Sequence, residues 1–305
     1  MIYPKFLHNS SKIIITAPSS GVGDKIEDYL KSINRLTNEG FILEETKSVR
    51  NNSFISNDYL TRSKEFNDSI NSNYDLLLIA RGGEFLLETL PFLKLDKILT
   101  NPIWIMGYSD PTSILFSITT KYDVATIYGY NSGSYDIPND CLIDNINILK
   151  GNLIKQINYD NRLISNNKEF NIRGRIIGGC IEVLNEITGM NIYDIDKFNN
   201  KYKEDGIIWY FDIYEMSSSE FYRTLLHLKY LNWFKEVKCI LLSKINNPKE
   251  EYYTYTEVIE KVFPNIIYIK DMCFGHTFPK LTIINGSIVN IDYKDNSCSI
   301  EFSLE

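Results

Sequence analysis

The segment Ile103-Trp-Ile-Met-Gly-Tyr-Ser-Asp-Pro-Thr-Ser-Ile-Leu115 joins an apolar run of strand type to a run of helix type. Ser109 lies two residues after the glycine that ends the apolar run, and Pro111 suits the first turn of a helix. A strand that turns sharply into a helix exposes the turn residue in front of the helix N-terminus, which is the geometry of a nucleophile elbow. The segment therefore predicts that Ser109 is a nucleophile. Gly-x-Ser without a second glycine is a weak pattern, so an ordinary turn capped by Asp110 or Thr112 stays open at this point.

Short apolar runs alternate with helix-like segments on both sides of this elbow. The predicted strands are 13–17, 41–44, 76–80, 103–106 and 124–130, and the predicted helices are 25–40, 56–72 and 84–93. Such alternation requires crossover connections and indicates an α/β domain with a parallel sheet. Ligands bind beyond the carboxyl ends of parallel strands, which here are residues 18–21, 81–84, 107–110 and 129–131.

A polar stretch rich in Asn and Asp, residues 138–171, precedes a second alternating pattern. We predict an N-terminal domain over residues 1–140, a linking region over 141–170 and a C-terminal α/β domain over 171–305. The C-terminal domain is predicted to hold strands at 174–179, 206–211, 237–242 and 266–270 and helices at 181–187, 218–231 and 255–262. Asn285-Gly286 is a hairpin-turn pattern, so 281–285 and 286–293 are predicted to form a closing hairpin.

Composition excludes several classes of protein. The chain has 305 residues, a formal net charge of −7 and no long basic run, which argues against a nucleic-acid or anionic-membrane partner. No apolar stretch approaches the roughly 20 residues that cross a bilayer, and the first residues lack a signal-peptide pattern. The five cysteines are scattered without Cys-x-x-Cys, and there are three histidines. We therefore expect a cytoplasmic protein with reduced thiols and with no metal site or cofactor.

Six short segments form an ordered set along almost the whole chain. They are Thr16-Ala17-Pro18-Ser19, Arg81-Gly82-Gly83, Gly107-Tyr108-Ser109-Asp110-Pro111-Thr112, Gly174-x-x-x-Gly178-Gly179, the strand ending at Asp212 with its following helix, and Phe274-Gly275-His276 followed by Pro279. Together they resemble the LD-carboxypeptidase family of serine peptidases, which includes the microcin C immunity peptidases. The resemblance implies a flavodoxin-like parallel-sheet N-terminal domain, a smaller α/β C-terminal domain and a Ser–His–Glu triad at an interdomain cleft. Family members are often homodimers.

The resemblance makes Ser109 the nucleophile and His276 its base. A serine hydroxyl is a poor nucleophile near neutral pH and needs a base within hydrogen-bond reach. His8 lies close to the N-terminus and His227 lies within a predicted helix, so neither suits this role. We therefore expect Ser109 and His276 to meet between the two domains.

The third member of the triad departs from the family pattern. The family usually has Glu-Asp at the end of the C-terminal-domain strand, with an Arg eleven positions after that Glu. Here Arg223 lies eleven positions after Asp212, which aligns Asp212 with the family's Glu. Aspartate can orient imidazole, but it is one methylene shorter, so the backbone must approach or the histidine must shift. Glu182, which follows the Gly178-Gly179 pair, is the rival acid.

The resemblance also assigns the oxyanion hole and the substrate contacts. The two oxyanion donors are the backbone N–H groups of Gly83 and Asp110. A glycine suits such a place because its bare backbone lets a substrate approach closely. Arg81, Gly82 and Glu84 are the expected substrate-binding residues, with Arg81 either holding a substrate carboxylate or forming a structural ion pair.

The predicted function is a serine carboxypeptidase or amidase that cleaves the L–D peptide bond of the cell-wall tetrapeptide and releases D-Ala. The alternative inside the family is hydrolysis of aminoacyl or peptidyl nucleotide amides, as in microcin C immunity, so the expected partner is a small peptide or peptidyl nucleotide. The changed triad acid leaves open a relative that binds its ligand without turnover. A glutamine-amidotransferase-like hydrolase would need a cysteine at an elbow, for which Cys180 is the candidate.

Overall fold

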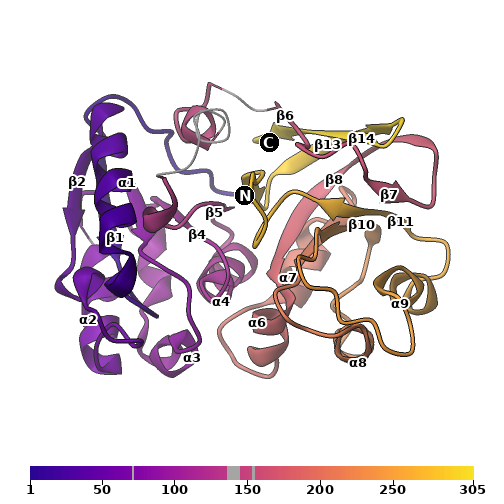
Figure 1. The fold of residues 1–305 in the computed structure, drawn as a ribbon, viewed down its shortest axis with the longest axis horizontal. Helices are drawn as coiled ribbons and strands as arrows, with labels where there is room; N and C mark the ends of the chain where they lie inside the picture. Colours follow the sequence, from indigo (N-terminus) through magenta and orange to yellow (C-terminus); the bar gives the residue numbers. More distant parts are fainter. Residues whose placement is uncertain (71, 136–144, 153–154) are drawn as a thin grey trace.

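The N-terminal half of the chain folds around a doubly wound sheet (Figure 1). The computed structural model describes residues 1–70, 72–135, 145–152 and 155–305. Among these residues the first sheet has the order β2-β1-β3-β4-β5-β12. The strands are β1 (Lys12–Thr16), β2 (Ile42–Glu45), β3 (Leu76–Ile79), β4 (Trp104–Gly107), β5 (Thr126–Tyr128) and β12 (Ile283–Asn285). The first five are parallel in the flavodoxin-like order, as predicted.

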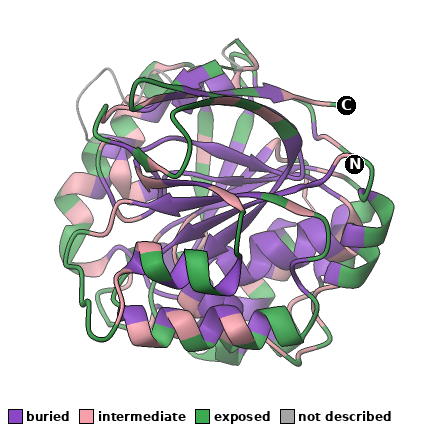
Figure 2. Ribbon diagram, turned by 90° about the vertical axis from the view of Figure 1, so that its right-hand side faces the viewer, coloured by how far each residue is buried: buried purple, intermediate pink, exposed green. Residues whose placement is uncertain are grey.

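The central strands of this sheet, β1, β3 and β4, are buried almost throughout and read as continuous apolar runs. Figure 2 shows the molecule from the side of the C-terminal half, where the strands inside are buried and the outer helices carry exposed residues. The helices are α1 (Ile26–Asn38), α2 (Tyr59–Ser69), α3 (Leu86–Thr89) and α4 (Thr112–Ser117). Helix α1 buries Tyr29 and Leu36 on one face. Asp58 caps α2 by accepting from the N–H groups of Leu60 and Thr61, as its position before the helix predicts.

The C-terminal half forms a mixed sheet in the order β6-β14-β13-β8-β9-β10-β11-β7 within the described residues. The strands are β6 (Lys155–Ile157), β7 (Ile164–Ser165), β8 (Glu169–Cys180), β9 (Ile207–Asp212), β10 (Val237–Ser243), β11 (Ile267–Met272), β13 (Ile288–Lys294) and β14 (Ser297–Ser303). Strands β8 to β11 are parallel, and the others pair antiparallel at the two edges. The helices are α6 (Ile181–Glu186), α7 (Ile195–Lys201), α8 (Ser218–Tyr230) and α9 (Tyr255–Val262).

The predicted linking region contributes strands of its own. Within residues 141–170, β6 and β7 extend the C-terminal sheet, and a helical turn covers residues 145–149. The proposed boundary between residues 140 and 141 lies outside the described residues. None of the described helices has both the length and the apolar character needed to span a membrane.

The predicted closing hairpin is wrong. Strand β12 pairs antiparallel with β5 of the first sheet, whereas β13 pairs with β8 and β14 of the second. Asn285-Gly286 is therefore the point where the chain passes from one sheet to the other. The true hairpin joins β13 to β14 through Asp295-Asn296, both with positive φ, as a tight hairpin turn requires.

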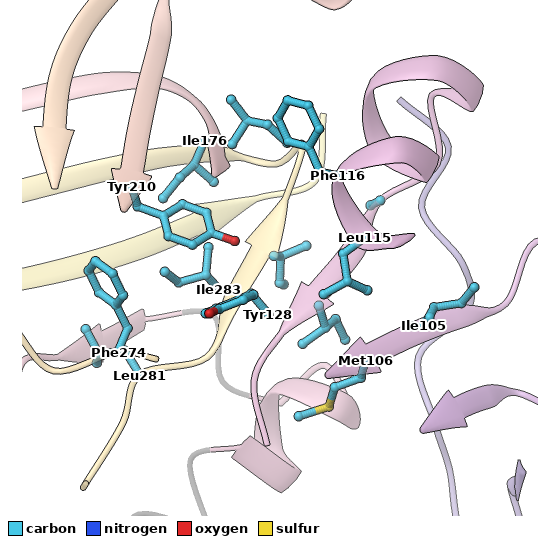
Figure 3. Packing of buried hydrophobic residues seen from close by; sticks show 14 of the residues in the cluster. Ile105, Met106, Leu115, Phe116, Tyr128, Ile176, Tyr210, Phe274, Leu281 and Ile283 are labelled. Carbon is cyan, nitrogen blue, oxygen red and sulfur yellow. The ribbon is translucent and has the colours of Figure 1, made fainter. Parts of the chain in front are cut away.

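The two halves are held together where the chain passes from one sheet to the other. Buried side chains from both sheets meet in one continuous core, in which Tyr128 and Tyr210 lie between the apolar residues of the two halves (Figure 3). The Tyr210 hydroxyl donates to Asn285 Oδ1 at 2.8 Å. Helix α4 lies at the boundary between the halves, where Thr112 Oγ1 accepts from the N–H of Cys180 at 3.0 Å (Figure 1). The boundary that carries the predicted site is thus packed and hydrogen-bonded.

Candidate active site

Ser109 occupies the sharp turn between β4 and α4. Its φ is +72°, a left-handed conformation that costs a non-glycine residue energy and is typical of a nucleophile elbow. Gly82, after β3, approaches this turn so closely that a Cβ there would lie 3.0 Å from Ser109 Cβ. The local structure is the strand, turn and helix that the sequence predicts. The Ser109 side chain faces the loop after β3.

The structure brings Ser109, His276 and Asp212 together across the boundary between the halves. His276 Nε2 lies 3.0 Å from Ser109 Oγ. Asp212 Oδ2 lies 2.8 Å from His276 Nδ1, off the line of the ring N–H, and Oδ1 accepts from the backbone N–H of His276 at 3.2 Å. This chain of contacts has the arrangement that the predicted triad of nucleophile, base and orienting acid requires.

Gly275 makes room for the short acid. Its φ is +73°, and a Cβ at this position would lie 2.0 to 2.3 Å from the Asp212 carboxylate. The backbone therefore closes on Asp212, which is the approach expected of an acid one methylene shorter than glutamate. The shorter acid reaches the imidazole at contact distance without a linear hydrogen bond.

We predict that Gly275→Ala lowers kcat by at least about 100-fold, because moving Asp212 or His276 breaks the alignment of the three side chains. Gly189→Ala is the matched control: Gly189 has a φ of +80° and nothing within 4 Å of its Cβ position. The control carries the backbone strain alone and should keep full activity. Steady-state kinetics of both variants check this, and equal activity of the two would contradict it.

Asp212 is fully buried and surrounded by donors. Burial alone would raise the pKa of Asp212, but the charge of His276 and the hydrogen bonds from His276 and Tyr128 outweigh it and hold the pKa below its usual value. Ser243 Oγ donates to Oδ1 at 3.4 Å. The carboxylate is therefore ionised at neutral pH, as an acid that orients imidazole must be.

Tyr128 is a site residue that the sequence analysis missed. Its hydroxyl donates to Asp212 Oδ2 at 2.6 Å and accepts from the backbone N–H of Ser109 at 3.2 Å. Burial and the charge of Asp212 raise the pKa of Tyr128 well above its ordinary value, so the hydroxyl stays protonated. The available signal was its place at the carboxyl end of β5, the strand next to β4.

Glu182, the rival acid, has another task. Its Oε1 accepts from the backbone N–H groups of Tyr214, Glu215 and Met216, each at 3.0 Å. These bonds hold the loop that follows β9, and no contact joins Glu182 to His276 within the described residues. The geometry thus favours Asp212 over Glu182 as the partner of the imidazole.

Cys180, the candidate thiol nucleophile, faces Glu182 instead of a base. Its Sγ lies 3.2 Å from Glu182 Oε2, and burial together with nearby carboxylates raises the pKa of the thiol well above its usual value. A protonated, buried thiol is unreactive. Among the described residues, no histidine contacts the Cys180 thiol as a base for a thiol nucleophile would.

The two expected oxyanion donors are Asp110, the residue after Ser109, and Gly83 in the loop after β3. Gly83 has a φ of +151°, and a Cβ there would lie 2.4 Å from Ser20 Oγ, so glycine is required. Within the described part of the chain, the N–H groups of Gly83 and Asp110 donate to no protein acceptor. Both line the same cavity as Ser109 and are available to a ligand there.

The Asp110 side chain holds the loops around these donors. Its Oδ2 accepts from Ser19 Oγ at 2.5 Å and from the N–H of Leu86 at 3.1 Å, so it caps α3 and not the following helix α4. Burial raises the pKa of Asp110 to about 6, although the hydrogen bonds from Ser19 and Leu86 oppose the shift. The carboxylate therefore titrates at mildly acidic pH.

This shift predicts a pH-dependent effect of Asp110→Asn on stability. The folded-state pKa is raised, so the folded wild type binds more protons than the unfolded chain between about pH 4 and 6 and loses stability as the pH rises through that window. The variant lacks this carboxyl group and therefore does not lose stability in this way. The free energy of unfolding of the variant minus that of wild type should increase by about 2 kcal/mol between pH 4.5 and pH 7.5. Urea denaturation at both pH values measures this, and a constant difference would contradict it.

A cavity of about 670 Å³ opens beside Ser109 and His276 and is lined from both halves of the chain. Arg81, Gly82 and Glu84, the expected substrate-binding residues, line it from the N-terminal half, and Tyr214 and Glu186 line it from the C-terminal half. Arg81 Nη1 also pairs with Asp24 at 2.8 Å, so a substrate carboxylate would compete with Asp24 for the guanidinium. Within the described residues, no three His, Cys, Asp or Glu side chains cluster as metal ligands.

Comparison with known proteins identifies a family domain in each half of the chain. Residues 13–129 match the LD-carboxypeptidase N-terminal domain, and residues 173–291 match the LD-carboxypeptidase C-terminal domain. The microcin C7 self-immunity protein MccF of Escherichia coli is 25% identical to this chain, with 89% of this chain and 87% of MccF covered.

Solved structures share the fold along almost the whole chain. Wild-type MccF has a TM-score of 0.84 at 22% identity, covering 99% of this chain and 98% of its own. An MccF-like protein from Bacillus anthracis has a TM-score of 0.81 at 23% identity, covering 99% and 100%. Muramoyltetrapeptide carboxypeptidase from Oxalobacter formigenes has a TM-score of 0.79 at 16% identity, covering 96% and 99%. Because the two matched domains span most of the sequence in the expected order, this chain belongs to the LD-carboxypeptidase family of serine peptidases.

Proposed function

We propose that this chain is a serine hydrolase of amide bonds, with Ser109 as nucleophile, His276 as base and Asp212 as orienting acid. The observation that carries the proposal is the 3.0 Å contact between Ser109 Oγ and His276 Nε2, which joins residues 167 positions apart. A base at this distance can take the hydroxyl proton as the oxygen attacks. The buried carboxylate beside Nδ1 supports the same assignment.

In the proposed reaction Ser109 Oγ bonds to the amide carbon while its proton passes to His276 Nε2. The carbonyl oxygen becomes an oxyanion, which the N–H groups of Gly83 and Asp110 are placed to stabilise. His276 then gives the proton to the departing nitrogen as the C–N bond breaks, leaving an ester on Ser109. Water, deprotonated by His276, hydrolyses that ester and restores the hydroxyl.

The favoured substrates are amides of aminoacyl or peptidyl nucleotides. The likeness to MccF supports this class, since structures of MccF are described in complex with glutamyl sulfamoyl guanosine and with aspartyl sulfamoyl adenosine. A cavity of about 670 Å³ has the size of a small-molecule site, and a ligand bound in it would lie beside Ser109. The loop after β1 supplies Ser20 and Gly23 to the cavity wall, where hydroxyl and N–H groups suit a polar nucleoside.

The second candidate is the L–D peptide bond of the cell-wall tetrapeptide. The likeness to muramoyltetrapeptide carboxypeptidase supports it. Arg81 on the cavity wall also suits the terminal carboxylate that a carboxypeptidase substrate presents. Both candidates use the same three side chains, so they differ only in what the cavity accepts.

Parallel assays separate these candidates. Purified protein is incubated with aspartyl sulfamoyl adenosine or with the cell-wall tetrapeptide, and the released sulfamoyl adenosine or D-Ala is quantified by mass spectrometry. A fluorophosphonate probe is reacted in parallel, and the labelled residue is mapped by peptide sequencing. We expect labelling at Ser109 and a larger kcat/KM for the sulfamoyl nucleotide.

The other outcomes are equally informative. Faster release of D-Ala would make the chain a carboxypeptidase of the tetrapeptide. If neither amide is cut and Ser109 stays unlabelled, the chain is a ligand-binding relative without turnover. Loss of activity on alkylation of Cys180, with Ser109 unlabelled, would point to a thiol hydrolase.

A further inference from the structure

Lys280 is a buried lysine beside the candidate active site. The proposed reaction gives this lysine no role. Its side chain is 1% exposed, and its Nζ has no hydrogen-bond partner in the described part of the chain. Nζ lies 3.3 Å from the ring centroid of Tyr108, 4.3 Å from that of Phe278 and 5.4 Å from that of Tyr130. A buried amino group without an acceptor is costly, even with the attraction of aromatic faces.

The position of this aromatic box (Tyr108, Tyr130 and Phe278) connects Lys280 to the imidazole. Tyr108 precedes the nucleophile Ser109, and its ring meets the His276 ring edge to face, with centroids 5.4 Å apart. Lys280 packs against that same tyrosine ring. A single tyrosine is therefore in contact with both the lysine and the imidazole.

Charge couples the same groups. Burial lowers the pKa of Lys280 to about 7, although the negative charge of Asp212 partly opposes the shift. His276 contacts that same carboxylate through Nδ1. The amino group of Lys280 and a protonated imidazole would therefore be attracted to the same carboxylate, and the amino group can change protonation near neutral pH.

We propose that Lys280 is a positioning residue for His276: seated on Tyr108, it holds that ring against the imidazole and, when protonated, competes with the imidazole for the carboxylate of Asp212. The consequence is that His276 stays neutral to lower pH than it would beside Asp212 alone, and a neutral imidazole is the form that accepts the Ser109 proton. The role of Lys280 in catalysis rests on the proposed function. Its effect on the protonation of His276 does not depend on that function.

Other titratable groups around the pair are accounted for. Tyr108 and Tyr130 face Lys280 from the segments after β4 and β5, and the charge of Asp212, at the end of β9, acts on it. Tyr214 is a further titratable neighbour of His276 among the described residues, with its ring centroid 4.5 Å from that of the imidazole. Burial raises the pKa of Tyr108 to about 12, so this ring stays neutral where Lys280 titrates.

The test is a proton NMR titration of the histidines in wild type and in Lys280→Met, which fills similar volume without charge. The chain has three histidines, and His8→Gln and His227→Gln assign their signals. We expect the midpoint of His276 to rise by about half a pH unit or more in Lys280→Met, because a competing positive charge is gone. Lys280→Gln provides a second uncharged variant with the same expected shift.

Lys150→Met is the matched control. Lys150 Nζ also lies near an aromatic ring, at 5.2 Å from the centroid of Phe41, and it pairs with Glu39 away from the site. This variant should leave the His276 midpoint unchanged. An unchanged midpoint in Lys280→Met and Lys280→Gln would overturn the proposal, whatever the activity of the variants.

Activity measurements distinguish a failure of this proposal from a failure of the proposed function. If wild type cuts either amide, the acid limb of its kcat/KM profile should move to higher pH in Lys280→Met by the same amount as the NMR midpoint. If wild type cuts neither amide, the proposed function has failed, and the NMR midpoint still decides the role of Lys280.

A stability measurement distinguishes a buried charge from mere packing. The folded-state pKa of Lys280 is lowered, so the unfolded chain binds more protons between about pH 7 and 10.5, and wild type gains stability as the pH rises through that window. Lys280→Met should therefore have a higher Tm than wild type at pH 6, and this advantage should shrink toward pH 10. A higher Tm together with a shifted His276 midpoint shows that the lysine is retained for a function and not for stability.

Discussion

Replacing Ser109 with alanine is expected to lower kcat by about 10⁴- to 10⁶-fold on whichever amide the wild type cuts. In the proposed reaction this substitution removes the atom that bonds to the substrate, while the N–H groups of Gly83 and Asp110 and the cavity remain. KM should change little, because the lost interaction forms in the transition state. Steady-state kinetics and loss of fluorophosphonate labelling measure the effect.

A neighbouring serine gives the control for this variant. Ser117 lies on helix α4, which follows Ser109. It is buried and donates to the backbone oxygen of Ser113, and it does not line the cavity. Ser117→Ala should keep its kcat. Ser109→Gly adds a second readout: a φ of +72° suits glycine, so this variant should lose activity as fully and gain about 1 kcal/mol of stability. Residual activity of Ser109→Ala within tenfold of wild type would exclude Ser109 as the nucleophile.

The sequence was informative where local patterns decide the structure. The elbow at Ser109 was predicted because an apolar run, a glycine and a proline follow one another within a few residues. The parallel strands of the first sheet were predicted for the same reason, since each is a short apolar run with a helix after it. The pairing of Ser109 with His276 required the family resemblance, because no local pattern joins residues so far apart.

The features that could not be predicted from the sequence depend on contacts between segments that lie far apart along the chain. Asn285-Gly286 carries a hairpin pattern, but the edge of β5 competes for the strand before it, and pairing between distant strands leaves no local signal. Tyr128 and Lys280 were missed because each reads as an ordinary residue beside an apolar run. Their roles depend on partners from other segments, Asp212 for Tyr128 and Tyr108 for Lys280.

Asp212→Asn is expected to lower kcat by about 10³- to 10⁴-fold with little change in KM. An amide at this position no longer balances a protonated imidazole, and it can also donate to Nδ1, which would hold the ring in the wrong tautomer. Tyr128 would lose a charged acceptor, so the free energy of unfolding should also fall by about 1–3 kcal/mol. Thermal denaturation separates this loss of stability from the loss of activity.

Two further variants sharpen the assignment of Asp212. Asp123→Asn is the control, since Asp123 pairs with Lys201 and the N-terminus outside the site, so its loss should affect stability and leave kcat unchanged. Asp212→Glu restores the residue type that the family resemblance puts here, yet it should stay at least about tenfold below wild type in kcat. The reason is that Gly275 already closes on the aspartate carboxylate, so a longer acid pushes the His276 backbone away. Full activity of Asp212→Asn would show that the imidazole takes its orientation from another group, and full activity of Asp212→Glu would show that the close approach of Gly275 is not required.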